Sequence, residues 1–298
     1  MAKYLCICMS EYGGESRVLN YSNSRSDAYE FTGDVRLEGS SATVFIGSMD
    51  NPNIPHTIKP YARKGFTLAM YSVSAFQIKA VPPEKLPHCT KTLDAPAILF
   101  STARIALNYF HSVSDVMVPL FATSQRFNRN VIFLVTNHNA SCVTSVHRKT
   151  IETLSKYEVV DIDRDKNRTL CFTNLIVGLK AHPSDLSIDP SPLSSLSTRN
   201  LTRLLRTTYS LKRDLVGDHI RPRMLIVSRT KNRKLMNELE LLKLARMLGF
   251  DPAIHDLGDH VEYSAKIVNT FDIMVAVHGS ALTNMLFLPE NAGRVLLS

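Results

Sequence analysis

A series of short apolar runs, each followed by a polar turn, constrains the fold of this chain more than any other feature. The runs cover residues 96–101, 130–136, 157–162, 223–228 and 272–277, and the terminal "RVLLS" continues the series. Strands of this length, spaced widely enough for crossover helices, are typical of parallel sheets in α/β proteins. The sequence therefore predicts an α/β fold whose turns gather at the carboxyl edges of its sheets.

The same series divides the chain into three parts. Residues 1–88 are predicted to be an irregular, β-rich region with strands at 40–48 and 67–81, whereas residues 89–215 and 216–298 are predicted to form two α/β units. The second unit ends directly after a strand. We therefore expect it to be incomplete at its C-terminus, without the elements that would cover its sheet.

Two helical segments are predicted in the second half of the chain. Residues 183–198 are rich in Ser, Pro and Asp and predict a linker, and a basic amphipathic helix follows at 199–214. A later helix is predicted to end at Gly249 and to pack through one apolar face. That face consists of Leu235, Leu239, Leu242, Ala245 and Leu248.

The balance of charges favours an anionic partner. The 298 residues include 35 Lys and Arg against 27 Asp and Glu, a formal net charge of +8. Nucleotides, nucleic acids and acidic glycans all suit such a surface, and a basic surface that is merely solvated is the alternative. We expect no nucleic acid, because the sequence contains neither a recognisable nucleic-acid-binding module nor an aromatic stacking platform.

The cysteines and the apolar segments bear on metal binding, on disulfides and on targeting to a membrane. The five cysteines have no CxxC spacing, so no metal site is predicted, and their odd number leaves at least one thiol free if disulfides form. No run reaches the ~18 to 20 apolar residues of a membrane span, and the N-terminal residues make a poor signal peptide. N-x-S/T sequons at Asn20, Asn139, Asn167 and Asn200 would suit a secretory protein.

The first candidate site is the turn in "DIMVAVHGSALTNMLFLPE", residues 272–290. A buried strand stops at His278 and Gly279, and a helical segment follows. Gly279 permits close approach of the backbone, while Thr283 and Asn284 add polar groups one turn into the helix. Because a helix N-terminus offers free N–H groups to an anion, the turn predicts a phosphate or diphosphate site. A purely structural histidine is the alternative.

The second candidate is "SRTKNRKLMNE", residues 228–238, which follows its own strand. Turns after two strands of an open sheet face the same crevice. Arg229 and Arg233 would grip a diphosphate with forked donors that are always charged, and we place Asn237 of the same segment with them. The alternative is that both arginines are solvated loop residues.

The third candidate is "NYFHSVSDVMVPLF", residues 108–121. His111 and Asp115 are four residues apart and so share one face if the segment is helical, where either group could act as a general base. The alternative is a surface pair that satisfies itself. The motifs GxSxG, GxxxxGKS/T, HExxH and GxGxxG are absent from the sequence.

Several segments together resemble the conserved blocks of family 61 glycosyltransferases, especially the plant xylan xylosyl- and arabinosyltransferases. They are "RSDAYEFTGDVRLEGSSATVF", "FHSVSDVMVPLF", "TLCFTNLIVGLKAH", "LIVSRTKNRKLMNE", "LARMLGF" and "VNTFDIMVAVHGSALTNMLFLP". They occur in the family's order from about Arg25 to the last residue. Ordered motifs are far more specific than any single one.

The resemblance implies a GT-B-like architecture in which two Rossmann-like domains face a cleft, the acceptor domain at 89–215 and the nucleotide-sugar donor domain at 216–298. It implies inverting transfer of a pentose from UDP-xylose or UDP-arabinose to xylan or a related cell-wall or glycoprotein glycan, with no obligatory cofactor. The HGxxLTN turn at His278 and the two arginines would hold the donor diphosphate, and Asp115 is the candidate base. The family's Golgi localisation and membrane anchor are expected too, although no anchor is seen in this chain.

The chain also departs from the family pattern. Residues 103–108 read "ARIALN" where the family has a glycine-rich run, which would obstruct any substrate approach or positive φ that the glycines allow. Ala281 replaces a second glycine, and Leu19 and Tyr29 occupy the places of a cysteine pair, consistent with a missing disulfide. The altered glycine run and the expected truncation favour an alternative, a catalytically inactive relative that acts as a binding or partner subunit in a Golgi glycosyltransferase complex. The intact Arg229, Arg233 and His278 argue for retained donor binding in either case.

Overall fold

The computed structural model describes residues 16–47, 54–103, 108–138, 146–188, 196–217, 220–230, 233–258 and 260–297. These residues divide into two compact units, each of mixed α/β structure. The first unit takes in the described residues of 1–103, 126–138 and 155–180, and the second takes in those of 104–125, 139–154 and 181–298. This division differs from the predicted domains, because most helices of the segment 89–215 pack with the second unit while its strands belong to the first.

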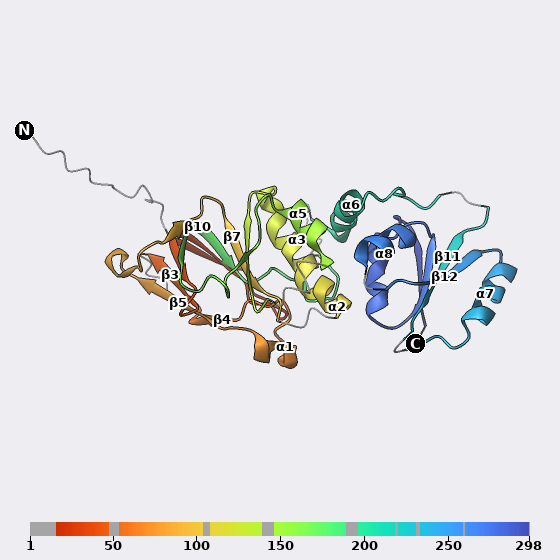
Figure 1. Cartoon of the computed structure of the whole chain (residues 1–298), viewed down its shortest axis with the longest axis horizontal. Helices are drawn as coiled ribbons and strands as arrows, with labels where there is room; N and C mark the ends of the chain where they lie inside the picture. Colours follow the sequence, from red (N-terminus) through yellow and green to blue (C-terminus); the bar gives the residue numbers. More distant parts are fainter. Residues whose placement is uncertain are drawn as a thin grey trace, which may run out of the picture. The chain divides into compact units, whose positions relative to one another are not determined.

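The described part of the first unit is built on a ten-stranded sheet (Figure 1). Eight strands follow the order β4-β5-β3-β2-β10-β7-β8-β9, while β1 pairs with β2 and β6 pairs with β10. The strands are β1 Arg17–Asn20, β2 Tyr29–Glu38, β3 Thr43–Gly47, β4 Thr57–Ile58, β5 Phe76–Val81, β6 Lys91–Thr92, β7 Ala97–Ser101, β8 Ile132–Thr136, β9 Val160–Asp161 and β10 Thr169–Val177. Short 3₁₀ turns occupy Pro83–Lys85 (η1) and Gln125–Phe127 (η3).

The parallel strands predicted in this part of the chain are confirmed. β7, β8 and β9 are parallel neighbours, and β7 is also parallel to β10. The prediction missed β2 and β10 as strands, and their antiparallel pairing joins the parallel strands to β1 and β3. The predicted boundary at residues 88/89 therefore falls within one continuous sheet.

The predicted strand at residues 67–81 is wrong in its first half. Residues Thr67–Ser72 form a short helix, α1, and only Phe76–Val81 forms a strand. Leucine, alanine and methionine are good helix formers, so an apolar run of this composition does not exclude a helix. The predicted strand at 40–48 is confirmed as β3.

Apolar side chains on β2 and on the parallel strands share one core. Phe31 and Val35 of β2, Leu99 of β7 and Leu134 of β8 are fully buried in a single cluster. Each buried side chain of this kind contributes roughly 1.5–3 kcal/mol. Burial of this shared surface is therefore what joins the N-terminal strands to the parallel ones.

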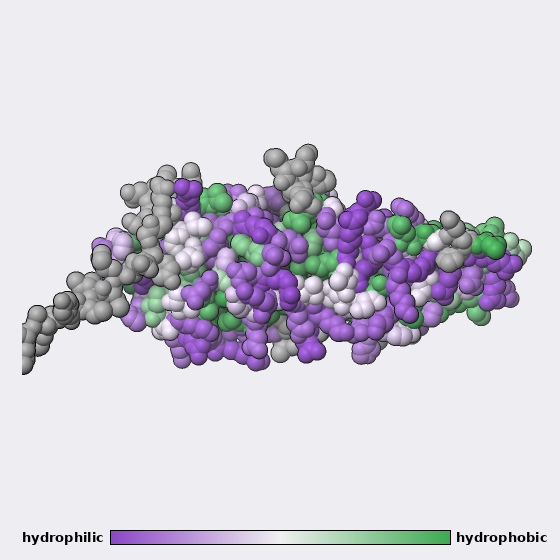
Figure 2. Space-filling view, turned by 90° about the horizontal axis from the view of Figure 1, so that it is seen from above, coloured by the Kyte–Doolittle hydropathy of each residue, from purple (hydrophilic) through white to green (hydrophobic). Residues whose placement is uncertain are grey.

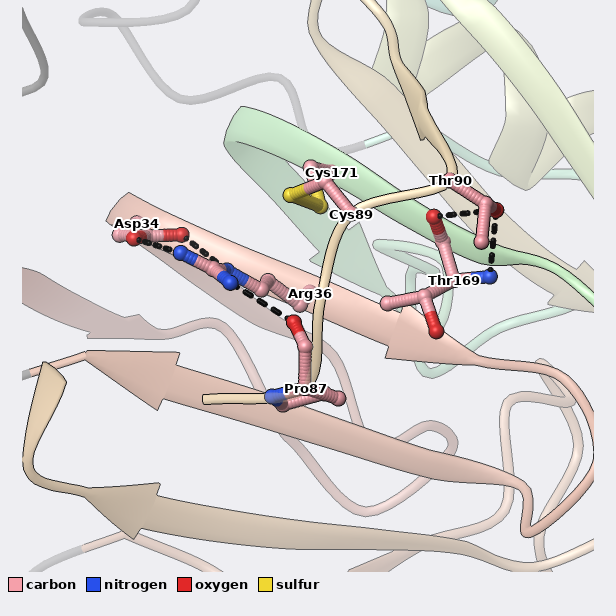
Figure 3. The surroundings of a disulfide bond; sticks show 7 residues. All are labelled: Asp34, Arg36, Pro87, Cys89, Thr90, Thr169 and Cys171. Carbon is pink, nitrogen blue, oxygen red and sulfur yellow. Dashed lines mark hydrogen bonds and ion pairs between the residues drawn. A yellow bond between two sulfur atoms is a disulfide. The ribbon is translucent and has the colours of Figure 1, made fainter. Parts of the chain in front are cut away.

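A disulfide between Cys89 and Cys171 fastens the loop before β6 to β10 (Figure 3). Arg36 holds the same loop from β2, since its Nη1 donates a hydrogen bond of 2.7 Å to the carbonyl oxygen of Pro87. The spacing of the five cysteines does not predict this pairing, which joins residues 82 positions apart. Cys6, Cys8 and Cys142 lie outside the described residues.

Two of the departures from the family pattern have a place in this unit. Leu19 and Tyr29 lie on the paired strands β1 and β2, where Leu19 pairs with Glu30 and Asn20 pairs with Tyr29. Ala103, which follows β7, has a positive φ of 51°. The backbone at the start of the altered run thus keeps the left-handed conformation that suits glycine, whereas residues 104–107 lie outside the described part of the chain.

In its described residues, the second unit contains a four-stranded sheet of order β12-β11-β13-β14 in which all neighbours are parallel. The strands are β11 Arg223–Ser228, β12 Asp251–Asp256, β13 Ile273–Val277 and β14 Gly293–Leu297. Helices α7 Glu238–Met247 and α8 Val261–Val268 lie on opposite faces of this sheet (Figure 1). The predicted strands β11, β13 and β14 are confirmed, and β12 and α8 were missed.

The face through which α7 packs differs from the predicted one. Ala245 is buried and Leu241 packs beside it on the sheet, but Leu239 and Leu248 of the predicted face are 69% and 67% exposed. They belong to the apolar surface that this helix leaves uncovered (Figure 2). Leucines occur on both sides of this helix, so periodicity alone does not select the packed face. Gly249, with a φ of +90°, ends the helix as predicted.

Helices from earlier in the chain complete the second unit. They are α2 Tyr109–His111, η2 Ser112–Met117, α3 Val118–Ser124, α5 Arg148–Leu154 and α6 Thr198–Thr208. α2, η2 and α3 form one continuous helical stretch with a π-helical turn at η2. α6 ends before the predicted limit of residue 214, and residues 189–195 of the predicted linker are outside the described ranges. The described helices are all too short or too polar to cross a membrane.

Candidate active site

The turn after β13 brings the predicted donor-binding residues together. Gly279 has a φ of 156° and a ψ of 179°, a conformation that is essentially restricted to glycine. A Cβ atom at this position would lie 2.0 Å from Nη1 of Arg229 and 3.3 Å from Cζ of Arg233. Both guanidinium groups, which follow β11, therefore lie against the backbone of the turn that follows β13.

His278 completes this cluster. Nη1 of Arg233 lies 3.0 Å from Nδ1 of His278. Arginine can only donate, so Nδ1 accepts, and the proton of the neutral imidazole is assigned to Nε2. The hydrogen bond fixes the direction of the ring and ties the two turns to each other.

No carboxylate of the described residues neutralises the positive charge of this cluster. Nη1 of Arg229 is buried and has no hydrogen-bond partner. Within the described residues, neither Arg229 nor Arg233 forms an ion pair with a carboxylate. A buried guanidinium nitrogen without an acceptor is costly, so the arrangement is suited to an anion that would supply the acceptor.

The remaining predicted ligands differ in their surroundings. Thr283 and Asn284 are buried in the 3₁₀ helix Ser280–Phe287 (η4), and the Oγ1 of one and the Oδ1 of the other have no hydrogen-bond partner. Nδ2 of Asn284 donates to the carbonyl oxygen of Ala281 at 3.0 Å. Asn237 is exposed at the position before α7, and its side chain makes no capping hydrogen bond. The structure therefore places Asn237 on the same turn as the arginines without joining it to their cluster.

His111 and Asp115 form a pair, as their spacing predicts. Nδ1 of His111 lies 2.7 Å from Oδ2 of Asp115, and the side chains are 18% and 0% exposed. The pair spans α2 and the π-helical turn η2, a helix type that occurs frequently at functional sites. Asn108 begins the stretch, because its side chain accepts a hydrogen bond from the backbone N–H of Phe110.

A second imidazole, which sequence reasoning missed, contacts residues that neighbour His111 in the chain. His147 is buried, lies 2.9 Å from Oγ of Ser112 through its Nε2 and stacks on the ring of Tyr109. Burial lowers the pKa of His147 to about 4, so the imidazole is neutral near pH 7. Only the tertiary packing reveals these contacts, because no sequence motif marks a histidine at this position.

The cluster at the Gly279 turn and the His111–Asp115 pair belong to the same compact unit. α2, which carries His111, packs against η4, which carries Thr283 and Asn284. A basic cluster for an anion and a histidine–carboxylate pair are thus built around neighbouring helices. Such an arrangement can bind a diphosphate and accept a proton.

Substituting Gly279 by alanine should weaken diphosphate binding. The new methyl group would displace the guanidinium of Arg229, and hydrogen bonds to charged groups contribute about 1.5–3 kcal/mol, so we expect a roughly 10- to 100-fold higher Kd for UDP. Calorimetric titration measures it. Gly65→Ala is the control, because nothing lies within 4 Å of a Cβ atom at that position. Equal UDP affinity in both variants would contradict the assignment.

The candidate site lies in a part of the chain that is similar to known proteins. The model of the family "Glycosyltransferase 61" matches residues 109–295, a range that includes every residue of the candidate site. The chain is 35% identical over 289 residues to the alpha-1,3-arabinosyltransferase XAT3 of Oryza sativa subsp. japonica, covering 94% of this chain and 49% of that protein.

Two further relatives carry related names. The beta-1,2-xylosyltransferase XYXT1 of Oryza sativa subsp. japonica is 33% identical, with 92% of this chain and 63% of that protein covered. The xylan glycosyltransferase MUCI21 of Arabidopsis thaliana is 30% identical, with coverages of 92% and 60%. The chain thus spans about half to two thirds of the length of these curated relatives.

Proposed function

The chain belongs to the glycosyltransferase 61 family, and on that premise we propose that it transfers a pentose, xylose or arabinose, from a UDP-sugar to xylan or a related cell-wall or glycoprotein glycan. The names of the relatives support the pentose and the xylan acceptor. The proposal includes a GT-B-like architecture. It is supported by the parallel sheet β12-β11-β13-β14, with its candidate ligands at the carboxyl edge.

One observation carries the proposal. Arg229 and Arg233 converge on Gly279, and the Nη1 of Arg229 is buried without an acceptor. A diphosphate would supply oxygens to both forked guanidiniums and to the backbone N–H groups at the start of η4. These groups stabilise the negative charge that develops on the UDP leaving group, so no metal ion is obligatory in this proposal.

The reaction transfers one glycosyl group with inversion. An acceptor hydroxyl oxygen attacks the anomeric carbon on the face opposite UDP and forms the new glycosidic bond. The bond between the anomeric carbon and the diphosphate oxygen breaks, and its electron pair leaves with UDP. The hydroxyl proton passes to a general base on the enzyme.

The geometry of the histidine–aspartate pair divides the role of the base between its members. Asp115 is the candidate from the sequence, but its carboxylate is fully buried beneath His111, whose ring is partly exposed. We therefore propose that the imidazole of His111 takes the proton, while Asp115 orients the ring and stabilises its charged form. This division follows the logic of other histidine–carboxylate pairs.

A Golgi localisation is part of the proposal. The Cys89–Cys171 disulfide supports it, because disulfides form and persist in oxidising compartments such as the secretory pathway. The sequon residues Asn20 and Asn167 are exposed, as glycosylation would require, and Asn139 lies outside the described residues. A membrane anchor, expected from the family, remains part of the proposal for the whole protein.

The alternative is a catalytically inactive relative that binds a nucleotide sugar and serves a Golgi glycosyltransferase complex. The observation that favours it is Ala103, which carries a methyl group at a left-handed backbone position where the family has glycine. The two functions differ in turnover. A protein that binds UDP-xylose and a xylan oligosaccharide without releasing UDP in their presence would be the inactive relative.

Binding of UDP and UDP-xylose to the purified chain, measured by calorimetry, tests the donor site. Arg229→Ala and His278→Ala should each raise the Kd for UDP at least about tenfold, since each removes part of the cluster. Arg246→Ala, an exposed arginine on α7, is the matched control for loss of charge. No UDP binding by the folded wild-type chain, or equal effects of all three substitutions, would contradict the proposal.

A further inference from the structure

A cavity of about 420 Å³ opens in the second unit between the start of α5 and the start of α8. It is distinct from the arginine cluster formed by Arg229, Arg233 and His278, since none of these residues lines the cavity. Tyr209 and Val261 are buried and form its apolar floor. Lys149, His260 and Glu262 form a polar rim above them.

The cavity and the arginine cluster share one edge of the sheet. β12 ends at Asp256, and His260 immediately precedes α8, just as His278 follows β13. β11, β12 and β13 are parallel, so the segments that follow them emerge at the same carboxyl edge. A ligand in the cavity would therefore lie at the edge of the sheet that carries the candidate donor site.

The polar rim offers hydrogen-bond acceptors to hydroxyl groups. Nζ of Lys149 lies 2.5 Å from Oε2 of Glu262, and Nζ of Lys266 lies 2.9 Å from Oε1. The hydrogen bond from Lys149, together with that from Lys266, lowers the pKa of Glu262 to about 2, so this carboxylate is ionised near pH 7. Each of its oxygens has a second lone pair that could accept a hydrogen bond from a hydroxyl group.

We propose that this cavity binds the acceptor saccharide, which deepens the proposed function and rests on it. A pyranose ring has an apolar C–H face and an edge of hydroxyl groups. The floor of Tyr209 and Val261 suits the face, and the charged rim suits the edge. The volume lies in the usual range of about 300–1,000 Å³ for small-ligand sites and suits a short oligosaccharide.

The floor is also held rigid, which favours recognition of a defined ligand. The hydroxyl group of Tyr209 lies 3.0 Å from Oγ1 of Thr150 on α5, and its ring makes an edge contact with Phe287 of η4. A side chain fixed by contacts on two elements presents the same surface to each ligand that enters. Less conformational freedom is then lost on binding.

NMR titration of the isotope-labelled chain with xylotriose tests the cavity. We expect saturable binding, with a Kd raised at least tenfold by Lys149→Ala and by His260→Ala. Both residues are exposed, so neither substitution removes buried core. Lys243→Ala, an exposed lysine on α7, is the matched control and should bind xylotriose like the wild type.

UDP binding, measured on the same samples, separates this proposal from the proposed function. Unchanged UDP affinity together with weakened xylotriose binding supports the acceptor site. If the wild type binds UDP but not xylotriose, or if both cavity variants bind xylotriose as the wild type does, the cavity is not the acceptor site. Absence of UDP binding in every sample would instead count against the donor site.

Discussion

Substituting either member of the His111–Asp115 pair should lower the rate of sugar transfer by about 100- to 10,000-fold, the usual contribution of a positioned general base. His111→Ala removes the imidazole that takes the proton. Asp115→Asn keeps the shape of the buried side chain but replaces the carboxylate 2.7 Å from Nδ1 with a neutral amide. Release of UDP from UDP-xylose in the presence of a xylan oligosaccharide measures the rate.

The double variant should transfer sugar only slightly more slowly than either single variant. Residues that act as one unit show strongly non-additive effects, because the second substitution removes a function that is already lost. UDP affinity should stay at the wild-type value in all three variants, which shows that the fold and the donor site are intact. Fully additive rate losses, or wild-type turnover by the double variant, would contradict the proposal that His111 and Asp115 act together as the general base.

Removing the disulfide with Cys89→Ser and Cys171→Ser together should lower the free energy of unfolding by about 4.5 kcal/mol. The bond closes a loop between residues 82 positions apart, and the chain-entropy account assigns a large loop a large reduction of the freedom of the unfolded chain. Replacing both cysteines avoids a free thiol at either position. Urea denaturation, followed by circular dichroism, measures the difference.

A reducing agent provides the matched control for this prediction. The wild-type chain, reduced before denaturation, should unfold at nearly the urea concentration of the double variant, and the reductant should not shift the variant itself. A difference below about 1 kcal/mol between oxidised wild type and variant would mean that the loop before β6 is already held by its other contacts. Arg36 and Pro87 supply one of these contacts.

The candidate donor site could be predicted from the sequence, because it depends on local signals and one general rule. β11 and β13 are marked by dense apolar runs, and the turns after parallel strands meet at one edge of a sheet. Arg229, Arg233 and His278 follow those runs directly, so their meeting required no knowledge of other contacts. The i, i+4 spacing likewise predicted the pairing of His111 with Asp115.

Other parts of the fold could not be predicted, because nonlocal contacts decide them. β12 begins with Asp-Pro and ends with His-Asp, so it lacks the apolar run that marks its neighbours. α7 has leucines on more than one side, and only its packing against the sheet decides which of them are buried. The helix at Thr67–Ser72 and the strand β2 have patterns that fit more than one structure until their neighbours are known.

By itself, the sequence determined the α/β class, the strands β7, β8, β11 and β13, and the residues gathered at the turn of Gly279, since apolar periodicity and glycine geometry are local properties. Only the tertiary structure decided that Asp115 is buried beneath His111, that α2 packs against η4 and that Cys89 bonds to Cys171. Each of these depends on segments that meet in space. A local sequence pattern does not predict such long-range contacts, because the packing of the whole unit sets which side chains are buried and how closely the segments approach.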